Sequence, residues 1–205
     1  TAEVGAYAAN LEKSESRDVF LNGIVVNSLD EVSKELNEES LHDYMLKHNK
    51  PGIAGVDTRA LTIHLRNNGA QKAYLHVDGT DMSEEEAIQK AQEWEGLDGQ
   101  DYASKVSDPN GYELSTEGDL HVVALDFGIK TNILRNLVKQ GMKVTVLPIT
   151  ATYEQIMAKN PDGVFLSNGP ADPNSLPQVV AVVKQLLGKI PLMGICLGNQ
   201  LLGLA

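Results

Sequence analysis

The residue best suited to covalent chemistry in this sequence is Cys196, the only cysteine. Residues 194–198 read Gly-Ile-Cys-Leu-Gly and close a short apolar run that is typical of a buried strand. Glycines two residues before and two residues after a nucleophile, at a strand-to-helix junction, are the sequence form of a nucleophile elbow. Side chains on the flanks of so sharp a turn would clash, and the turn lifts the nucleophile clear of the sheet. The spacing therefore predicts that Cys196 acts as a nucleophile.

A helix expected to begin at Leu197 would make that sulfur more reactive. The free N–H groups and the positive dipole end of the helix would face the sulfur and favour the thiolate over the thiol. A thiolate attacks a carbonyl carbon, whereas a thiol hardly does. A second interpretation stays open, because free cysteines are among the most buried residues and Cys196 could belong to a core. The flanking glycines favour the nucleophile.

A second candidate for chemistry is the loop at residues 168–173, which reads Asn-Gly-Pro-Ala-Asp-Pro. Acyl transfer passes through a tetrahedral oxyanion, and an enzyme needs two N–H donors to hold it. The backbone N–H groups of Gly169 and Leu197 are the candidates for these donors. The loop also has a purely structural interpretation, as a tight turn in which Asp172 caps a helix.

The elements that must position these residues are strands and helices that alternate after residue 120. The apolar patterns predict strands at 122–127, 143–148, 163–167 and 191–195, and helices at 130–141, 152–160 and 177–187. This alternation predicts an α/β fold with a parallel, doubly wound sheet. Ligands bind such sheets beyond the carboxyl ends of the strands, where Cys196 and the 168–173 loop would lie. Residues 126–130 lack the spacing of a phosphate-binding motif, and we expect a structural turn there.

The first part of the chain predicts a smaller, mixed α/β domain. We expect strands at 19–26, 52–56 and 73–77, and helices at 40–47, between the cap Asp57 and the stop Gly69, and at 83–94 with Ser83 as its cap. From 95 to 119 the chain becomes polar and rich in glycine. We therefore predict a first domain at 1–106, a linker at 107–120 and a second domain at 121–205.

Composition narrows the classes of function. The formal net charge of −11 argues against nucleic acid or an anionic membrane as a partner, since both would repel the chain. No apolar run approaches the roughly 20 residues that span a bilayer. A single cysteine fits a reducing compartment, and we expect a cytoplasmic protein. The five histidines show no metal-ligand spacing, so we expect no metal site, and none is an evident partner for Cys196.

Two groups of motifs resemble one known family. Residues 166–170, Leu-Ser-Asn-Gly-Pro, and 194–200, Gly-Ile-Cys-Leu-Gly-Asn-Gln, resemble the class I (triad) glutamine amidotransferases. Residues 55–62, Gly-Val-Asp-Thr-Arg-Ala-Leu-Thr, and 126–135, Asp-Phe-Gly-Ile-Lys-Thr-Asn-Ile-Leu-Arg, resemble the small, glutaminase subunits of carbamoyl-phosphate synthetases. The resemblance extends over nearly the whole chain.

This resemblance implies a division of labour between two subunits. The small subunit hydrolyses glutamine, and the ammonia passes to a large partner subunit that uses bicarbonate and ATP, with Mg²⁺, to make carbamoyl phosphate for arginine or pyrimidine synthesis. No cofactor is then expected on this chain. Cys196 would be the nucleophile, Gly169 and Leu197 would supply the oxyanion hole, and Gln200 and the position of Ala171 would contact glutamine.

The chain departs from the family pattern in several ways. The family usually has glycine at the position of Ala171 and histidine at that of Asn199. The catalytic His and Glu of the family lie beyond Ala205, and a glutamine-contacting serine lies in an N-terminal segment that this chain lacks. The sequence begins at Thr1 without a methionine and stops within an apolar helical pattern, so we interpret it as a piece of a longer protein.

Because no base is available to the cysteine, we expect the 205-residue chain to have little or no glutaminase activity. Three other functions stay open, one of which is a plain α/β binding domain in which Cys196 is buried and inert. The chain could belong to another class I amidotransferase, although residues 57–59 and the extra N-terminal domain argue against that. It could also be a non-catalytic docking module of the same fold, for which Ala171 and Asn199 are the only support.

Overall fold

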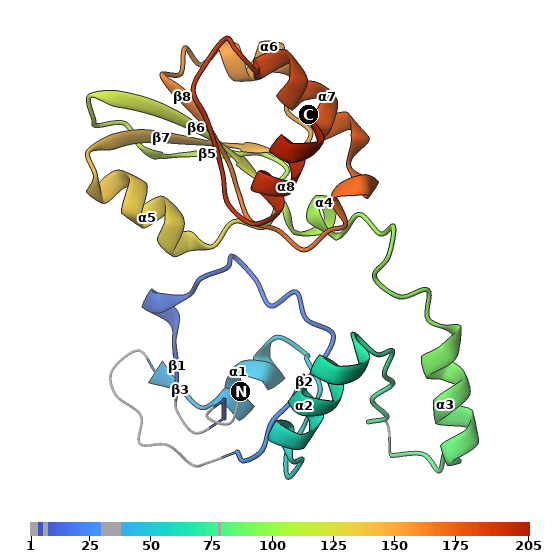
Figure 1. Ribbon diagram of the computed structural model, residues 1–205. Helices are drawn as coiled ribbons and strands as arrows, with labels where there is room; N and C mark the ends of the chain where they lie inside the picture. Colours follow the sequence, from blue (N-terminus) through green and yellow to red (C-terminus); the bar gives the residue numbers. More distant parts are fainter. Residues whose placement is uncertain (1–3, 6–7, 30–37, 78) are drawn as a thin grey trace. The chain divides into compact units, whose positions relative to one another are not determined.

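The structure is a computed structural model that describes residues 4–5, 8–29, 38–77 and 79–205. Its contacts divide the chain into two compact units, Thr1–Gly96 and Leu97–Ala205 (Figure 1). Each unit is described by itself. No helix in the described ranges is both long enough and apolar enough to cross a membrane.

The second unit is built on a five-stranded sheet with the order β5-β7-β6-β8-β9. The strands are β5 (Tyr112–Ser115), β6 (Leu120–Asp126), β7 (Met142–Pro148), β8 (Gly163–Leu166) and β9 (Leu192–Gly194). Strands β7, β6, β8 and β9 pair in parallel, whereas β5 runs antiparallel to β7 at the edge of the sheet. The parallel sheet predicted from the sequence is therefore confirmed, and β5 is an addition to it.

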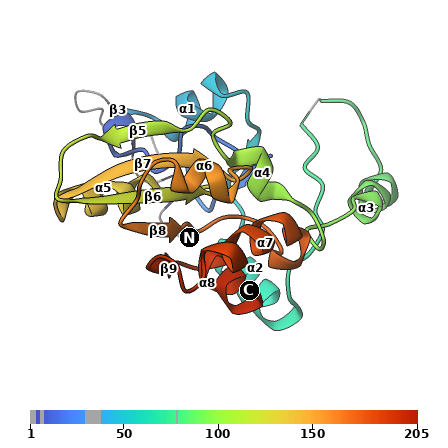
Figure 2. The ribbon, with the colours of Figure 1, turned by 90° about the horizontal axis from the view of Figure 1, so that it is seen from above.

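Helices cover both faces of this sheet (Figures 1 and 2). They are α4 (Tyr102–Val106), α5 (Thr131–Lys139), α6 (Tyr153–Met157), α7 (Pro177–Leu186) and α8 (Leu197–Leu204), with a short 3-10 turn, η2 (Pro173–Ser175). Leu134 of α5 packs in one core cluster, with Ala124 of β6. Val183 of α7 and Leu201 of α8 pack in the cluster on the other face. This is the arrangement of a doubly wound fold.

The central strand β6 shows why the sheet is buried on both faces. Val123 and Leu125 belong to the cluster beneath α7 and α8, while Ala124 between them belongs to the cluster beneath α5. Side chains alternate across a strand, so a continuous apolar run places hydrophobic groups on both faces. All three residues are at most 1% exposed, so neither face of β6 is open to solvent.

The turn after β6 is held by Asp126, which is only 4% exposed. Its Oδ1 accepts the N–H groups of Gly128 and Ile129, both at 2.9 Å. Its Oδ2 accepts the N–H of Asp108 at 2.8 Å. The carboxylate therefore closes the turn that leads to α5 and ties the segment before β5 to the end of β6, which is the work of a structural turn.

In its described residues, the first unit has short strands and three α-helices. β1 (Ala9–Asn10) pairs with β3 (Glu38–Glu39), β2 (Ile24–Val25) pairs with β4 (Gly52–Ile53), and the helices are α1 (Leu41–Lys47), α2 (Thr58–Asn68) and α3 (Glu84–Glu93), with a 3-10 turn, η1 (Leu11–Lys13). The predicted caps are confirmed. Asp57 accepts the N–H of Ala60 at 2.9 Å, and Ser83 forms a reciprocal capping box with Glu86.

All three strands predicted for this unit were wrong in extent or existence. The strand expected at 19–26 is reduced to β2, the strand expected at 52–56 is reduced to β4, and residues 73–77, though described, form no strand. Alternating apolar residues indicate that a segment could pair in a sheet, but pairing also needs a neighbouring strand to accept the backbone hydrogen bonds. In the segment 19–26, such a partner is found only from Ile24 onward: Ile24 and Val25 pair with β4, and Val26 donates its N–H to Ile53 O.

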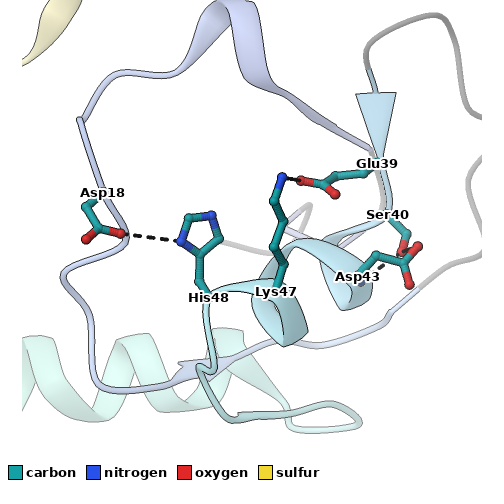
Figure 3. Close-up of polar contacts among 6 residues, drawn as sticks. All are labelled: Asp18, Glu39, Ser40, Asp43, Lys47 and His48. Atoms are coloured by element: carbon teal, nitrogen blue, oxygen red, sulfur yellow. Dashed lines mark hydrogen bonds and ion pairs between the residues drawn. The ribbon is translucent and has the colours of Figure 1, made fainter.

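Polar contacts fix α1 to the segment that precedes it (Figure 3). Ser40 caps the helix, because its Oγ accepts the N–H of Asp43 at 3.1 Å and donates to the Asp43 carboxylate at 2.8 Å. One turn later, Lys47 Nζ lies 3.7 Å from Glu39 Oε1. These contacts anchor both ends of a helix that is only seven residues long.

The residue after α1, His48, contacts an earlier segment of the unit (Figure 3). Its Nδ1 lies 3.3 Å from Asp18 Oδ1. The N–H of Val19, and then His48, lower the pKa of the Asp18 carboxyl. A lowered pKa means that folding favours the carboxylate, so this contribution is present above the unfolded pKa and is lost as the pH falls through the folded one.

The boundary between the units differs from the predicted one. Residues 107–120, predicted as a linker, contain β5, and residues 97–106 belong with the second unit and contain α4. Ala103 of α4 is fully buried in the core of that unit. A polar, glycine-rich composition predicted a linker, but one buried alanine and a four-residue edge strand suffice to attach the segment.

A test of this fold is to shorten Leu134, the α5 side chain that is 1% exposed. We expect Leu134→Ala to lower the free energy of unfolding by about 2–5 kcal/mol, because it leaves a cavity against the sheet. Leu120→Ala is the matched control, since Leu120 is 52% exposed, and it should change stability by about 0.5 kcal/mol or less. Denaturant unfolding followed by circular dichroism measures both, and equal losses would contradict the packing of α5.

Candidate functional site

Cys196 lies in the turn between β9 and α8, in a backbone conformation that side chains rarely adopt. Its φ is 53° and its ψ is −114°, and its side chain is exposed. A non-glycine residue held in such a region costs about 1–3 kcal/mol and persists only where its surroundings impose it. The sulfur is thus presented at the surface by a strained turn, as the sequence pattern predicted for an elbow.

The two glycines that flank the cysteine are required by close backbone approach. A Cβ on Gly194 would lie 2.5 Å from the carbonyl carbon of Gly198. A Cβ on Gly198 would lie 2.1 Å from the carbonyl oxygen of Leu166, at the end of β8. Both distances are far below van der Waals contact. The glycines therefore let β9, the turn and the first turn of α8 pack directly on the backbone of the neighbouring strand.

The first turn of α8, which follows Cys196, contains both paired and unpaired N–H groups. The N–H of Gly198 donates to Ser167 O and to Ile195 O, both at 3.0 Å. The N–H of Leu197 has no hydrogen-bond partner among the described residues. An unpaired donor at the start of a helix is suited to an anion, because the helix dipole adds to its positive potential.

The loop that follows β8 is held against the turn that follows β6. A Cβ on Gly169 would lie 2.1 Å from Phe127 O, so the two backbones touch. The Asn168 side chain spans the same junction, donating to Gly128 O at 3.0 Å and accepting the N–H of Lys130 at 3.1 Å. In the part of the chain that the structure describes, the N–H of Gly169 is also without a partner.

The structure places the predicted site residues along one edge of the sheet. The Ser167–Gly198 hydrogen bond joins the 168–173 loop to the elbow of Cys196. Gln200 is exposed, in the first turn of α8, and its N–H donates to Cys196 O at 3.1 Å. Ala171 is half-buried against the core cluster that contains Leu201.

Asp172 has the structural role that was left open. Its carboxylate accepts the N–H of Asn174 at 2.9 Å and caps η2. The contacts of Asn168 and Gly169 therefore hold the start of the loop, and the cap formed by Asp172 holds its end.

The histidine of the second unit lies at the other end of the sheet. His121 is the second residue of β6 and forms a hydrogen bond with Thr145 Oγ1 at 2.8 Å. Cys196 follows the carboxyl end of β9, and β9 is parallel to β6 through β8. Residue His121 is thus on the amino side of the sheet. Among the described residues, no group of three or more His, Cys, Asp or Glu could hold a metal ion.

Ser167 is a residue that the sequence analysis did not assign to the site. It is fully buried at the end of β8, and its hydroxyl bonds to the backbone on both sides of the junction between β6 and β8. The only signal in the sequence was a polar residue closing an apolar run. That signal does not distinguish a buried serine from the first residue of a solvent-exposed loop.

Two family models match the chain. Residues 123–205 match the model "Glutamine amidotransferase class-I", and residues 1–75 match the model "Carbamoyl-phosphate synthase small chain, CPSase domain". The first match contains Cys196 and the 168–173 loop. The second lies within the first structural unit and contains residues 57–59.

Three curated relatives share the name carbamoyl phosphate synthase small chain. The chain is 42% identical to the carbamoyl phosphate synthase small chain of Acinetobacter baylyi, over 98% of this chain and 58% of that protein. It is 44% identical to the small chain of Zymomonas mobilis, over 98% and 59%, and 42% identical to that of Syntrophotalea carbinolica, over 98% and 57%. The chain thus spans slightly more than half the length of these curated relatives.

The strain at the elbow can be measured directly. We expect the free energy of unfolding of Cys196→Gly to exceed that of Cys196→Ala by about 1 kcal/mol, because glycine adopts a positive φ without steric penalty. Cys196→Gly should therefore unfold at a higher denaturant concentration. The two variants both lack the sulfur, so their difference reports the backbone alone. If Cys196→Ala were as stable as Cys196→Gly, the turn would not be strained.

Proposed function

Because the chain belongs to the family of carbamoyl phosphate synthase small chains, we propose that Cys196 hydrolyses glutamine to supply ammonia for carbamoyl phosphate synthesis. The observation that carries this proposal is the exposed sulfur, held at a φ of 53° between two glycines that admit no side chain. A core cysteine has no need of such a turn. A nucleophile does, because its substrate must reach it from above the sheet.

The reaction begins with attack of the Cys196 thiolate on the side-chain amide carbon of glutamine. The carbonyl π electrons move onto oxygen, forming a tetrahedral oxyanion. As this intermediate collapses, its –NH2 group takes up one proton and leaves as ammonia, the C=O bond forms again, and a thioester remains. Water then adds to the thioester through a second oxyanion, loses a proton and releases glutamate and the thiolate.

Two N–H groups are available to hold these oxyanions. Those of Leu197 and Gly169 lack partners within the described chain, and they come from the two segments that the Ser167–Gly198 hydrogen bond joins. Donors fixed in this way before the reaction need not reorganise when charge develops. The start of α8 adds its dipole, which favours both the thiolate and the oxyanion.

Specificity for glutamine would come from residues around the elbow. We assign Gln200, exposed in the first turn of α8, to contact with the substrate, and we place Ala171 at the wall of the glutamine site. The ammonia would pass to a large synthetase subunit that binds ATP and Mg²⁺ and activates bicarbonate, in the cytoplasm, for arginine or pyrimidine synthesis. The net charge of −11 fits neither a nucleic-acid nor a membrane partner for this chain.

Labelling tests whether the site is a working nucleophile. A chloroketone analogue of glutamine should modify Cys196 in the natural full-length chain, and glutamine should slow the modification. The variant Cys196→Ser should not be modified and should lose glutamine hydrolysis almost entirely. Peptide mass spectrometry identifies the adduct. An inert Cys196 would instead indicate a docking module that has kept only the fold.

The 205-residue chain by itself should hydrolyse glutamine slowly. Proton transfer from a positioned base typically contributes about 10²–10⁴-fold to the rate, and His121 lies at the wrong end of the sheet to serve Cys196. We therefore expect the 205-residue chain to release ammonia from glutamine at least 10²-fold more slowly than the natural full-length chain. A coupled glutamate assay measures this. Equal rates would show that a base lies within these residues.

A further inference from the structure

We propose that Ser167 is a positioning residue that holds the Asn168–Gly169 peptide so that the Gly169 N–H faces the oxyanion. The inference rests on the proposed glutamine hydrolysis and adds to it a residue that never touches the substrate. It starts from the hydrogen bonds of a single buried hydroxyl group.

The Ser167 hydroxyl bridges two backbone groups. The residue is fully buried at the end of β8. Its Oγ accepts the N–H of Phe127 at 2.9 Å, which orients the hydroxyl from the β6 side. The same Oγ then donates its hydrogen to the carbonyl oxygen of Asn168 at 2.8 Å. With one bond accepted and one donated, the hydroxyl has a defined direction.

The second of these bonds also fixes the direction of the Gly169 N–H. The carbonyl of Asn168 and the N–H of Gly169 belong to one peptide group, which is planar and trans. In such a group the C=O and N–H bonds point in opposite directions. Because the carbonyl points toward the buried Ser167 hydroxyl, the N–H must point away from it, and it has no partner among the described residues.

Gly169 is a position where this orientation needs support. Its contact with Phe127 O, at 2.1 Å from an added Cβ, excludes every residue except glycine. Glycine adopts a wide range of φ, so its preceding peptide can rotate more readily than any other. A rotated peptide would present the Asn168 carbonyl where the N–H should be. An acceptor in that place repels the oxyanion instead of stabilising it.

The backbone of Ser167 links this peptide to the other proposed donor. Its carbonyl oxygen accepts the N–H of Gly198 at 3.0 Å, in the first turn of α8, next to Leu197. One residue therefore touches both segments that supply the oxyanion hole. Its hydroxyl orients the Gly169 donor. Its carbonyl binds the first turn of α8 and so fixes the position of the helix end that carries the Leu197 donor.

If the hydroxyl had only a structural role, its loss would lower stability without a separate effect on kcat. A second buried serine provides the control. Ser107 is a second buried serine of the same unit, 5% exposed, whose Oγ accepts the N–H of Ile149 at 3.0 Å. Ser107→Ala and Ser167→Ala would each leave one buried backbone N–H without its hydroxyl acceptor. Only Ser167→Ala also frees the Asn168–Gly169 peptide.

The experiment compares these variants in the natural full-length chain, with any partner subunit that copurifies. We expect Ser167→Ala to lower kcat for glutamine hydrolysis by about 10²-fold, the usual effect of losing an oxyanion donor. KM should change by less than about threefold, because the donor acts mainly on the transition state. Ser107→Ala should lose a similar amount of thermal stability but keep kcat within about threefold of wild type.

Alkylation by iodoacetamide separates the donor from the nucleophile. This reaction needs the Cys196 thiolate but forms no oxyanion, so Ser167→Ala should be alkylated at the wild-type rate. Ser167→Thr keeps the hydroxyl and should recover at least tenfold of the lost kcat. If the alanine variant fails to fold, the threonine variant carries the test by itself, and it should fold and keep kcat within about tenfold of wild type.

Contrary outcomes overturn either the role of Ser167 or the proposed function itself. If Ser167→Ala keeps the kcat of Ser107→Ala, or if its alkylation slows as much as its turnover, Ser167 does not orient the donor. A threonine variant that folds but has lost 10²-fold in kcat also overturns the role of the hydroxyl. If wild type releases no ammonia from glutamine, or if Cys196→Ser still does, the proposed function itself fails, and this inference fails with it.

Discussion

The site depends on backbone packing directly against backbone where the parallel strands end. The α-carbon of Gly198 approaches the carbonyl of Leu166, and that of Gly169 approaches the carbonyl of Phe127, so closely that neither position admits a methyl group. These contacts bring the ends of β6, β8 and β9 into one compact layer. The strained conformation of Cys196 follows from them, because the chain must pass from β9 into α8 within two residues, Ile195 and Cys196. Packing around the site thus maintains a turn that is unfavourable by itself.

Much of this arrangement could be predicted from the sequence. Continuous apolar runs predicted the parallel strands, and the spacing of Gly194, Cys196 and Gly198 predicted the elbow, because each signal lies within a few neighbouring residues. The edge strand β5 and the missing strand at 73–77 could not be predicted, since strand formation depends on a partner elsewhere in the chain. The bridging role of Ser167 likewise involves Phe127, a residue 40 positions away.

Hydrogen bonds between buried or half-buried polar side chains and the backbone recur at the carboxyl ends of the strands. Asp126 accepts three backbone N–H groups, Asn168 binds the turn before α5, and Ser167 binds the ends of two strands. Loops that carry chemistry are usually mobile, and mobility would weaken donors that must be fixed before reaction. Here, side chains that satisfy the backbone of the loops also fix their shape. The stability of this unit and the fixed orientation of the proposed donors therefore depend on the same contacts.

The antiparallel strand β5 affects how the second unit could be isolated. The match to the amidotransferase model begins at residue 123, after β5 and within β6. A recombinant domain cut at that point would lack β5, the partner of β7, leaving seven-residue β7 with a free edge rich in β-branched residues. Exposed edges of this kind recruit other strands and cause aggregation. An expressible version of this unit should therefore start before Leu97, where the contacts that belong to it begin.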